Sequence, residues 1–245
     1  MPMMDWGVLA WVTGGVLVVA MLYAAVGHAG ASGYIAVMTL AGWAPNVVKP
    51  TALMLNLLVA ALATWQFAPY FEWRRFWPFA LLALPLAFVG GYLTVPPEVF
   101  RRLVGGVLWA SAVRIWLPRP AASPVTLPPL GLALPSGAGI GLLSGLTGTG
   151  GGIFLTPLLL LARWAETKTA SAVSAAFILG NSLSGLLGYV ASAAPLPPFV
   201  WPLFVAALVG GWLGAHVGSR YLSARGVEYA LSVVLLIAGG KLLFG

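Results

Sequence analysis

Charged residues are scarce in this chain, and cysteine does not occur in it at all. Only 7% of the 245 residues are charged and 60% are hydrophobic, whereas about a quarter of the residues in a soluble domain carry charge. So few charges cannot cover the surface of a water-soluble fold, and we therefore expect the lipid bilayer to be the solvent. The absence of cysteine excludes disulfides, iron–sulfur clusters and thiol catalysis, and it identifies no redox compartment.

Acidic residues are the rarest charges, and none lies inside an apolar stretch. The five acids stand at expected helix ends or loops: Asp5, Glu72, Glu98, Glu166 and Glu228. No carboxylate pair is therefore available for intramembrane aspartyl proteolysis or for a carboxylate-lined sodium or proton path. A GxxxxGK[ST] phosphate-binding loop is also absent, which excludes ATP hydrolysis by that route. We expect neither an enzyme nor a resident cofactor or metal ion.

Basic residues give the chain a net charge of +7, but their distribution argues against nucleic acid as a partner. The twelve Lys and Arg residues occur singly or in pairs at the ends of apolar runs, without a basic stripe of interleaved aromatics. At such places long basic side chains snorkel to lipid headgroups, and we interpret Lys49 and Lys168 in this way. No basic segment precedes Trp6, so we expect the first apolar run to be a retained helix rather than a signal peptide.

Eight apolar stretches are candidates for helices that cross the hydrocarbon layer, which takes about 20 residues. They are Trp6–Val26, Val47–Phe67, Phe76–Thr94, Phe100–Leu117, Leu130–Leu146, Lys168–Val190, Phe199–His216 and Val227–Phe244. Two apolar pieces, Tyr34–Ala41 and Ile153–Ala162, are too short to span alone. We therefore expect an all-α, polytopic transmembrane bundle.

A proline-rich connector at 118–129 separates two parts of nearly equal length, 1–117 and 130–245. Both parts contain, in the same order, a glycine-rich break, a short apolar piece, a helix with one asparagine, and a helix with a Gly-Gly-aromatic-Leu run. This order predicts an N-terminal and a C-terminal transmembrane repeat with pseudo-symmetry between them. It leaves open whether the repeats are inverted or parallel. A homodimer also stays open.

The glycine-rich breaks, at 27–33 and 147–152, are the strongest pointers to a site. Backbone groups cannot stay unsatisfied in hydrocarbon, so a helix broken near the midplane must line a cavity or be buried in protein. Matching breaks in two repeats indicate a transporter binding site, because a half-helix that starts there aims free N–H groups and its positive dipole end inward. Two such ends could hold an anion without a formal positive charge. The alternative is that these glycines only allow helices to pack closely.

The predicted substrate-binding residues surround these breaks. Each asparagine could donate to an oxyanion, or could instead bond a neighbouring helix, and the hydroxyl groups could bond back to their own helix. His28 could be an anion ligand, a proton carrier or a structural imidazole. The set is Gly27, His28, Gly30, Ser32, Asn56, Thr147, Thr149, Gly150, Gly151 and Asn181. Thr51, Ser174 and Ser182 are weaker candidates.

The chain resembles the TauE/SafE family of sulfite exporter-like membrane proteins over nearly its whole length. The resemblance rests on VGHAGASGYIAV and KPTALMLNLLVA in the first half, and on GLLSGLTGTGGGIFLTPLLLL and SAVSAAFILGNSLSGLLGYV in the second. The second glycine run, followed by an apolar stretch and Pro157, is the most typical part. The first half departs from the family pattern, with His28, Ala29, Ala31 and Ser32 where a purer glycine run is common.

This resemblance implies a secondary transporter, in the export direction, for a small sulfur-containing anion such as sulfite or a sulfoacetate-like sulfonate. It also implies a multi-pass protein of the bacterial inner membrane. The residues and the resemblance agree on an anion. Neither establishes the direction of transport, for which export is the expectation, and neither identifies the coupling ion. A passive anion channel and a non-transporting scaffold or accessory subunit remain as alternatives.

Overall fold

The computed structural model describes residues 6–25, 30–116, 124–197, 201–221 and 224–244, and helices are the only regular elements within them. Up to residue 116 the α-helices are α1 (Trp6–Ala25), α2 (Ala31–Leu40), α3 (Pro45–Phe67), α4 (Trp73–Tyr92) and α5 (Pro97–Trp116), with the 3-10 turn η1 (Ala68–Tyr70) after α3. Beyond it are α6 (Leu130–Thr147), α7 (Gly152–Leu161), α8 (Thr167–Ala191), α9 (Trp201–Tyr221) and α10 (Ala224–Phe244). The all-helical expectation is confirmed.

Five of the expected spans are confirmed as helices that are long and apolar enough to cross a membrane: α1, α3, α4, α6 and α8. The other three coincide with α5, α9 and α10, which are 20, 21 and 21 residues long and whose crossing stays a prediction. The two short apolar pieces are confirmed as α2 and α7, of ten residues each. Of the connector, residues 124–129 form no helix or strand, and 117–123 lie outside the described residues.

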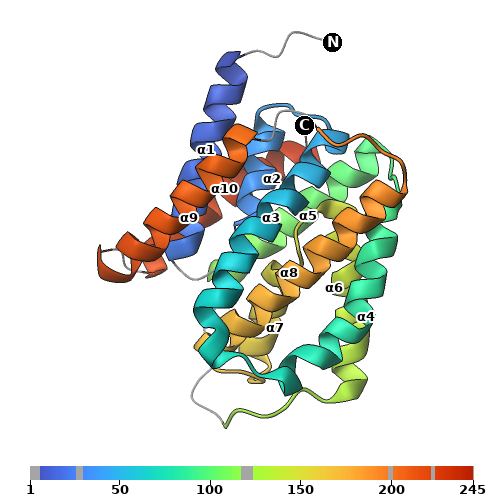
Figure 1. Ribbon diagram of the computed structural model, residues 1–245, viewed down its shortest axis with the longest axis vertical. Coiled ribbons are helices and arrows are strands. Elements are labelled where there is room, and N and C mark those ends of the chain that lie inside the picture. The colour runs from blue at the N-terminus through green and yellow to red at the C-terminus, as the bar shows by residue number, and fades with distance from the viewer. Residues whose placement is uncertain (1–5, 26–29, 117–123, 198–200, 222–223, 245) are drawn as a thin grey trace.

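Helices from the two parts of the chain pack against each other in pairs (Figure 1). α1 lies along α9, α4 along α6 and also α8, α3 along α8, and α5 along α10. The short helix α2 packs on α3 and α10, whereas α7 packs mainly on α8. Because every large contact joins an element before residue 116 to one after 130, neither part could keep its buried surface without the other.

Glycine allows the α4–α6 pair to approach to backbone contact. Side-chain methyl groups placed at Gly137, Gly141 and Gly145 of α6 would lie 2.3, 2.2 and 2.1 Å from the carbonyl oxygens of Phe79, Ala83 and Ala87. Residue numbers rise together along both helices, so the pair is parallel. In lipid the hydrophobic effect does not drive helices together, so their association depends on close packing. Small residues on such a face allow the helix backbones to pack closely.

The α1–α9 pair is built in the same way. A methyl group at Gly210 would lie 2.3 Å from the Leu17 carbonyl oxygen, and one at Gly214 would lie 2.1 Å from that of Met21. Here too the residue numbers rise together, so α1 and α9 are parallel. The two close parallel pairs, α4–α6 and α1–α9, form the flanks of the bundle.

The α3–α8 and α5–α10 pairs run antiparallel. Near one end of α3 the Tyr189 hydroxyl of α8 donates to the Asn46 carbonyl oxygen at 2.9 Å, and further along Leu53 lies 3.4 Å from the methyl position of Gly185. Residue numbers therefore rise along α3 and fall along α8. The methyl position of Gly105 in α5 likewise meets Leu243 in α10, while that of Gly239 meets Trp109. α3 and α8 cross in the middle of the bundle and bring the two asparagine-bearing helices into contact.

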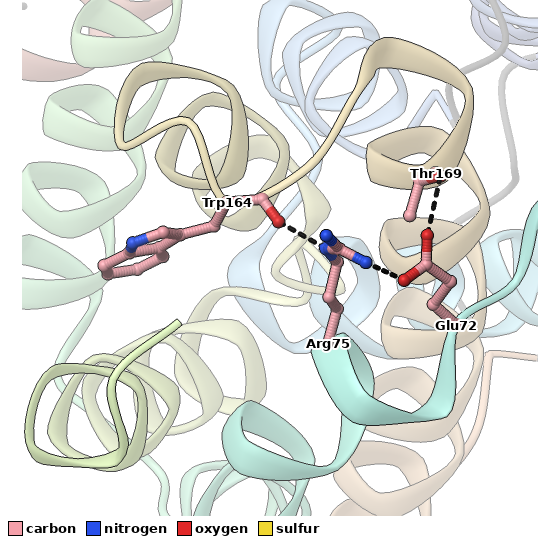
Figure 2. Close-up of polar contacts among 4 residues, drawn as sticks. All are labelled: Glu72, Arg75, Trp164 and Thr169. Atoms are coloured by element: carbon pink, nitrogen blue, oxygen red, sulfur yellow. Dashed lines mark hydrogen bonds and ion pairs between the residues drawn. The ribbon is translucent and has the colours of Figure 1, made fainter. Parts of the chain in front are cut away.

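Polar contacts tie the start of α4 to the loop after α7 and to the start of α8 (Figure 2). Arg75 pairs with Glu72, and its Nε donates to the Trp164 carbonyl oxygen. The Thr169 hydroxyl donates to the Glu72 carboxylate at 3.4 Å. Figure 2 shows the Arg75 side chain between Trp164 and Glu72. Arg75 thus links the start of α4 to the loop after α7, and Glu72 links it to α8.

Replacing Gly141 with alanine tests the α4–α6 contact. The new methyl group would meet only backbone atoms of Ala83, which cannot move without shifting a helix. We expect a loss of about 1–3 kcal/mol, the usual cost of overpacking, seen as a lower melting temperature in detergent. Gly139→Ala is the control, because nothing lies within 4 Å of its methyl position, and helix propensity predicts a gain of up to about 1 kcal/mol. Equal melting temperatures for the two variants would contradict the contact.

Candidate functional site

The break between α6 and α7 adopts a conformation that glycine permits and other residues resist. Gly148, Gly150 and Gly151 have φ angles of +83°, +73° and +84°, a region costly for residues with a Cβ. Three left-handed residues in four reverse the chain within the bundle, so that α7 begins at Gly152 with Gly151 as its N-cap. The first N–H groups of α7 have no partner inside the helix.

Both asparagines converge on this break from opposite halves of the chain. A methyl group placed at Gly150 would lie 3.0 Å from Asn56 Nδ2 of α3 and 3.0 Å from Ser182 Oγ of α8. One placed at Gly151 would lie 3.2 Å from Asn181 Nδ2 of α8. The glycine backbone is thus in direct reach of three polar side chains, and any larger residue would separate them from it.

Some polar groups of the break are already hydrogen-bonded. Asn56 Nδ2 donates to the Gly148 carbonyl oxygen at 3.2 Å. The Thr147 hydroxyl donates to the Leu143 carbonyl oxygen at 2.7 Å and lies 3.0 Å from the Thr149 hydroxyl. Because the Thr147 proton is used within its own helix, Thr149 is the donor between the two. The two threonines stabilise the end of α6, which is the local role the sequence left open for hydroxyls.

Other polar groups here are fully buried and have no partner among the described residues. They are Asn181 Nδ2 and Oδ1, Asn56 Oδ1, Ser182 Oγ, Ser144 Oγ and Ser174 Oγ. Asn56, Asn181, Ser144 and Ser182 are each 0% exposed. Leaving one such group unpaired costs about 1–3 kcal/mol, so a cluster of them needs an explanation. A small polar ligand that pairs with them supplies one.

Lys49 is buried and does not snorkel. Its Nζ donates to the carbonyl oxygens of Gly90, Gly91 and Leu93 at 2.9, 2.9 and 3.0 Å, and its side chain is 6% exposed. The expectation that Lys49 reaches lipid headgroups is therefore wrong, because the carbonyls at the end of α4 accept all three of its protons. Lys168 lies on the exposed surface as expected, and its Nζ lies 4.8 Å from the centre of the Tyr70 ring.

Lys49 also contributes to the electrostatics of the site. Its backbone carbonyl oxygen lies 2.9 Å from the methyl position of Gly148, so the residue borders the break. Among the side chains that the structure describes, it is the one charged group that is buried, and no acid is buried with it. Together with the positive end of the α7 dipole, it makes the potential here favourable to an anion.

The first break is built differently in its described part. Gly27 and His28 lie outside the described residues. Gly30 is the N-cap of α2 and its methyl position contacts Val19 of α1, while the Ser32 hydroxyl lies 2.6 Å from the Tyr23 hydroxyl. The structure therefore brings Asn56, Asn181, Gly150 and Gly151 together, with Thr147 and Thr149 beside them. It places Gly30 and Ser32 against α1 instead.

Two serines lie at the site although the sequence did not single them out as main candidates. Ser182 was only a weak candidate, yet it contacts the Gly150 position as closely as Asn56 does. Ser144 was not selected, although it lies one helical turn before Thr147 and is fully buried. The signal for Ser144 was available, because residues three apart on a helix share a face.

Together the fold and this site define a polytopic helical membrane protein of the transporter class. The chain belongs to the TauE/SafE sulfite exporter family, because the family model "Sulfite exporter TauE/SafE" matches residues 12–242. The chain is also 44% identical over 234 residues to "Probable membrane transporter protein y4hK" of Sinorhizobium fredii (strain NBRC 101917 / NGR234), across 93% of this chain and 95% of that relative. No solved structure matches the chain. The family is one of transporters, not enzymes, and the resemblance seen in the sequence is confirmed.

Gly150→Ala tests whether the break must admit polar side chains to its backbone. Alanine there meets a left-handed backbone and also crowds Ile178, Asn56 and Ser182. Gly42→Ala is the matched control, because Gly42 has a φ of +78° with nothing within 4 Å of its methyl position. Backbone strain alone costs about 1–2 kcal/mol, so we expect Gly150→Ala to lower the melting temperature clearly more than Gly42→Ala does. Equal losses would show that only strain matters.

Proposed function

We propose that this protein is a secondary transporter that exports a small sulfur-containing anion, such as sulfite or a sulfoacetate-like sulfonate. The anion binds at the start of α7, where Asn56, Asn181 and Ser182 surround Gly150 and Gly151. The observation that carries the proposal is the cluster of fully buried, unpartnered amide and hydroxyl groups at a broken-helix N-terminus. The family name and the name of the 44% identical relative support transport of this kind.

An anion fits these groups better than a cation does. Helix N-termini present N–H donors and the positive end of a dipole, which attract negative charge. Asn181 Nδ2 and the Ser182 hydroxyl add donors that need no formal charge. The site also holds free acceptors, Asn56 Oδ1 and Asn181 Oδ1, but the positive end of the α7 dipole and the Lys49 ammonium group would repel a sodium ion that they coordinated. The dipole and Lys49 therefore favour negative charge, and the amide and hydroxyl donors favour anions that carry oxygen atoms.

We further propose that the two parts of the chain are inverted repeats. In each part the second helix has ten residues, and the other helices have 18 to 25. Suppose that helices α1 to α5 are exchanged, in order, with α6 to α10. The α1–α9 contact then becomes the α6–α4 contact, and the α3–α8 and α5–α10 contacts each map onto themselves. These two self-paired contacts are antiparallel, so the axis that relates the parts is perpendicular to the helices. An axis in the membrane plane is the definition of an inverted repeat.

Inverted repeats provide a mechanism for transport. Two packings of nearly equal energy arise because each repeat can adopt the conformation of the other. Rocking of one repeat against the other would expose the site first to one side of the membrane and then to the opposite side. Arg75, Glu72 and Thr169 tie one end of the bundle (Figure 2), and these contacts would have to break for that end to open.

Two asparagine variants test the site against a structural role. Asn181→Leu removes an unpartnered amide, so we expect an unchanged or higher melting temperature without ligand, and loss of stabilisation by anions. Asn56→Leu leaves the Gly148 carbonyl oxygen without its donor, so we expect it to lower stability by about 1–3 kcal/mol as well. The measurement is the melting temperature of purified protein with sulfite, sulfate, thiosulfate, sulfoacetate, taurine or acetate.

The outcome also separates the alternatives. Variants that change only stability, together with no response of the wild type to any anion, would favour a scaffold. Retained anion flux in vesicles without saturation or exchange would favour a passive channel. Saturable stabilisation by a sulfur anion that Asn181→Leu abolishes is the result that we predict for a transporter.

Charge distribution also predicts how the protein lies in the bacterial inner membrane. Among the described residues, the end where α4 begins and α5 ends carries seven basic residues. They are Arg74, Arg75, Arg114, Arg163, Lys168, Arg220 and Arg225. The opposite end has Lys49, Arg101, Arg102 and Lys241, of which Lys49 is buried. By the positive-inside rule, the end that carries the connector faces the cytoplasm.

A reporter fusion at the C-terminus tests this orientation. We expect alkaline phosphatase fused after residue 245 to be active, because it folds only outside the cytoplasm, and a fluorescent protein at the same place to be dark. Fusions within the connector 118–129 should give the reverse. Fluorescence from the C-terminal fusion would contradict the orientation and leave the binding site unaffected.

A further inference from the structure

One face of α8 borders both the break at α7 and the crossing helix α3. Its residues recur at every third or fourth position, which places them on one side of the helix: 171, 174, 178, 182, 185 and 189. On this side Ile178 packs against the methyl position of Gly152, the first residue of α7, and Leu53 of α3 lies 3.4 Å from that of Gly185. Ser174 lies on the same face, one helical turn closer than Ile178 to the end where α8 begins.

The Ser174 hydroxyl group is buried and has no protein partner. The side chain is 3% exposed, and its Oγ makes no hydrogen bond among the described residues. A hydroxyl inside a helix can donate to a carbonyl oxygen one turn back, as Thr147 does in α6. Ser184 of α8 donates instead to the Leu84 carbonyl oxygen of α4. Ser174 does neither, so its hydroxyl group needs a partner that the chain does not supply.

Ser174 occupies the place in the second half of the chain that Lys49 occupies in the first. Each lies seven residues before the asparagine of its helix, Lys49 before Asn56 and Ser174 before Asn181. Seven residues are about two helical turns, or about 10 Å along the axis. Because α3 and α8 are antiparallel, Lys49 and Ser174 lie on opposite sides of the asparagines. Both are buried, so each half places one buried polar group on its own side of the proposed site.

A neighbouring face of α8 is apolar along the same stretch. Val173 and Phe177 belong to a hydrophobic cluster with Leu155 of α7. An anion that approached through this cluster would lose its hydration without gaining a hydrogen bond. The face with Ser174 continues toward the start of α8 with a second buried hydroxyl group, that of Ser171. It is therefore the more polar route between the site and the end where α8 begins.

We propose that Ser174 is a further substrate-contacting residue, which donates its hydroxyl hydrogen to the anion on the path between the proposed site and the end where α8 begins. This inference rests on the proposed function and deepens it, because it names the side from which the anion reaches the asparagines. In the proposed orientation that side is the cytoplasmic entrance, and Lys49 lies toward the exit. Thr169 and Glu72 hold the start of α8 to α4 (Figure 2), so the path opens when this contact breaks.

Single cysteines test the path, because the chain contains no cysteine of its own. Ser174→Cys is compared with Ser184→Cys, whose serine is bonded to α4 instead. The probes are an anionic and a cationic methanethiosulfonate that do not cross membranes, and each rate is divided by the rate with a free thiol in solution. In vesicles we expect Ser174→Cys to react only from the side that carries the connector, and faster with the anionic probe. Ser184→Cys should stay unreactive, and sulfite should slow the reaction of Ser174→Cys.

Alanine variants separate a binding role from a structural one. Ser174→Ala breaks no protein hydrogen bond, so its melting temperature without ligand should stay the same or rise, whereas Ser184→Ala should melt lower. The second readout is the sulfite concentration that gives half of the maximal uptake rate in vesicles with the connector outside. Loss of a hydrogen bond to a charged group predicts a rise of about tenfold or more for Ser174→Ala, and a change within about twofold for Ser184→Ala.

Specific results would overturn the role of Ser174. One is a lower melting temperature for Ser174→Ala without ligand, or an unchanged half-maximal concentration, since either means a structural role only. Another is a Ser174→Cys variant that reacts from neither side, or only from the side opposite the connector. If Asn181→Leu abolishes anion stabilisation while Ser174→Ala changes nothing, the proposed site stands and the role of Ser174 is wrong. If no anion stabilises the wild type or enters the vesicles, the proposed function and the role of Ser174 are both contradicted.

Discussion

The requirement that buried polar groups find partners governs this molecule, because hydrocarbon offers none. It explains why the chain is helical wherever it meets lipid, and why it leaves the helix only at glycine-rich places enclosed by other helices. At the break between α6 and α7, three left-handed glycines bring the start of α7 beside Asn56 and Asn181. Part of this polar surface is satisfied by the protein. Among the groups left without a partner, Asn181 Nδ2 and the serine hydroxyls are the ones that could donate to the proposed anion.

Close backbone packing holds this polar site in a fixed frame. Glycines let α6 and α8 approach α4 to backbone contact, and α3 crosses α8 at the site itself. Lys49 joins the two parts of this frame, since its ammonium group caps α4 while its backbone borders Gly148. A buried cation that is fully hydrogen-bonded stabilises the structure and also contributes positive potential. Lys49 therefore both holds the end of α4 and contributes to the positive potential at the proposed site.

The sequence predicted the helices and both short helices, because hydropathy and backbone satisfaction are local or nearly local properties. Asn56 and Asn181 lie at the second glycine break, whereas a single site shared by both breaks stays a prediction. The sequence did not reveal the burial of Lys49, since a lysine at a helix start snorkels or caps a neighbour according to where that neighbour lies. The unpartnered state of Ser174 was equally invisible, because it depends on which residues surround a hydroxyl in the fold. Gly27 and His28 lie outside the described residues and stay predictions.

The central claim is that an oxyanion binds between the start of α7 and the asparagines of both halves. Selenite tests it most directly, because it has the shape and charge of sulfite and its selenium atom is located by anomalous scattering. The account predicts one strong anomalous peak, with selenite oxygens within hydrogen-bond distance of Asn181 Nδ2 and the first N–H groups of α7. A peak elsewhere in the protein, with Asn181 and Ser182 bonded to protein atoms instead, would contradict it.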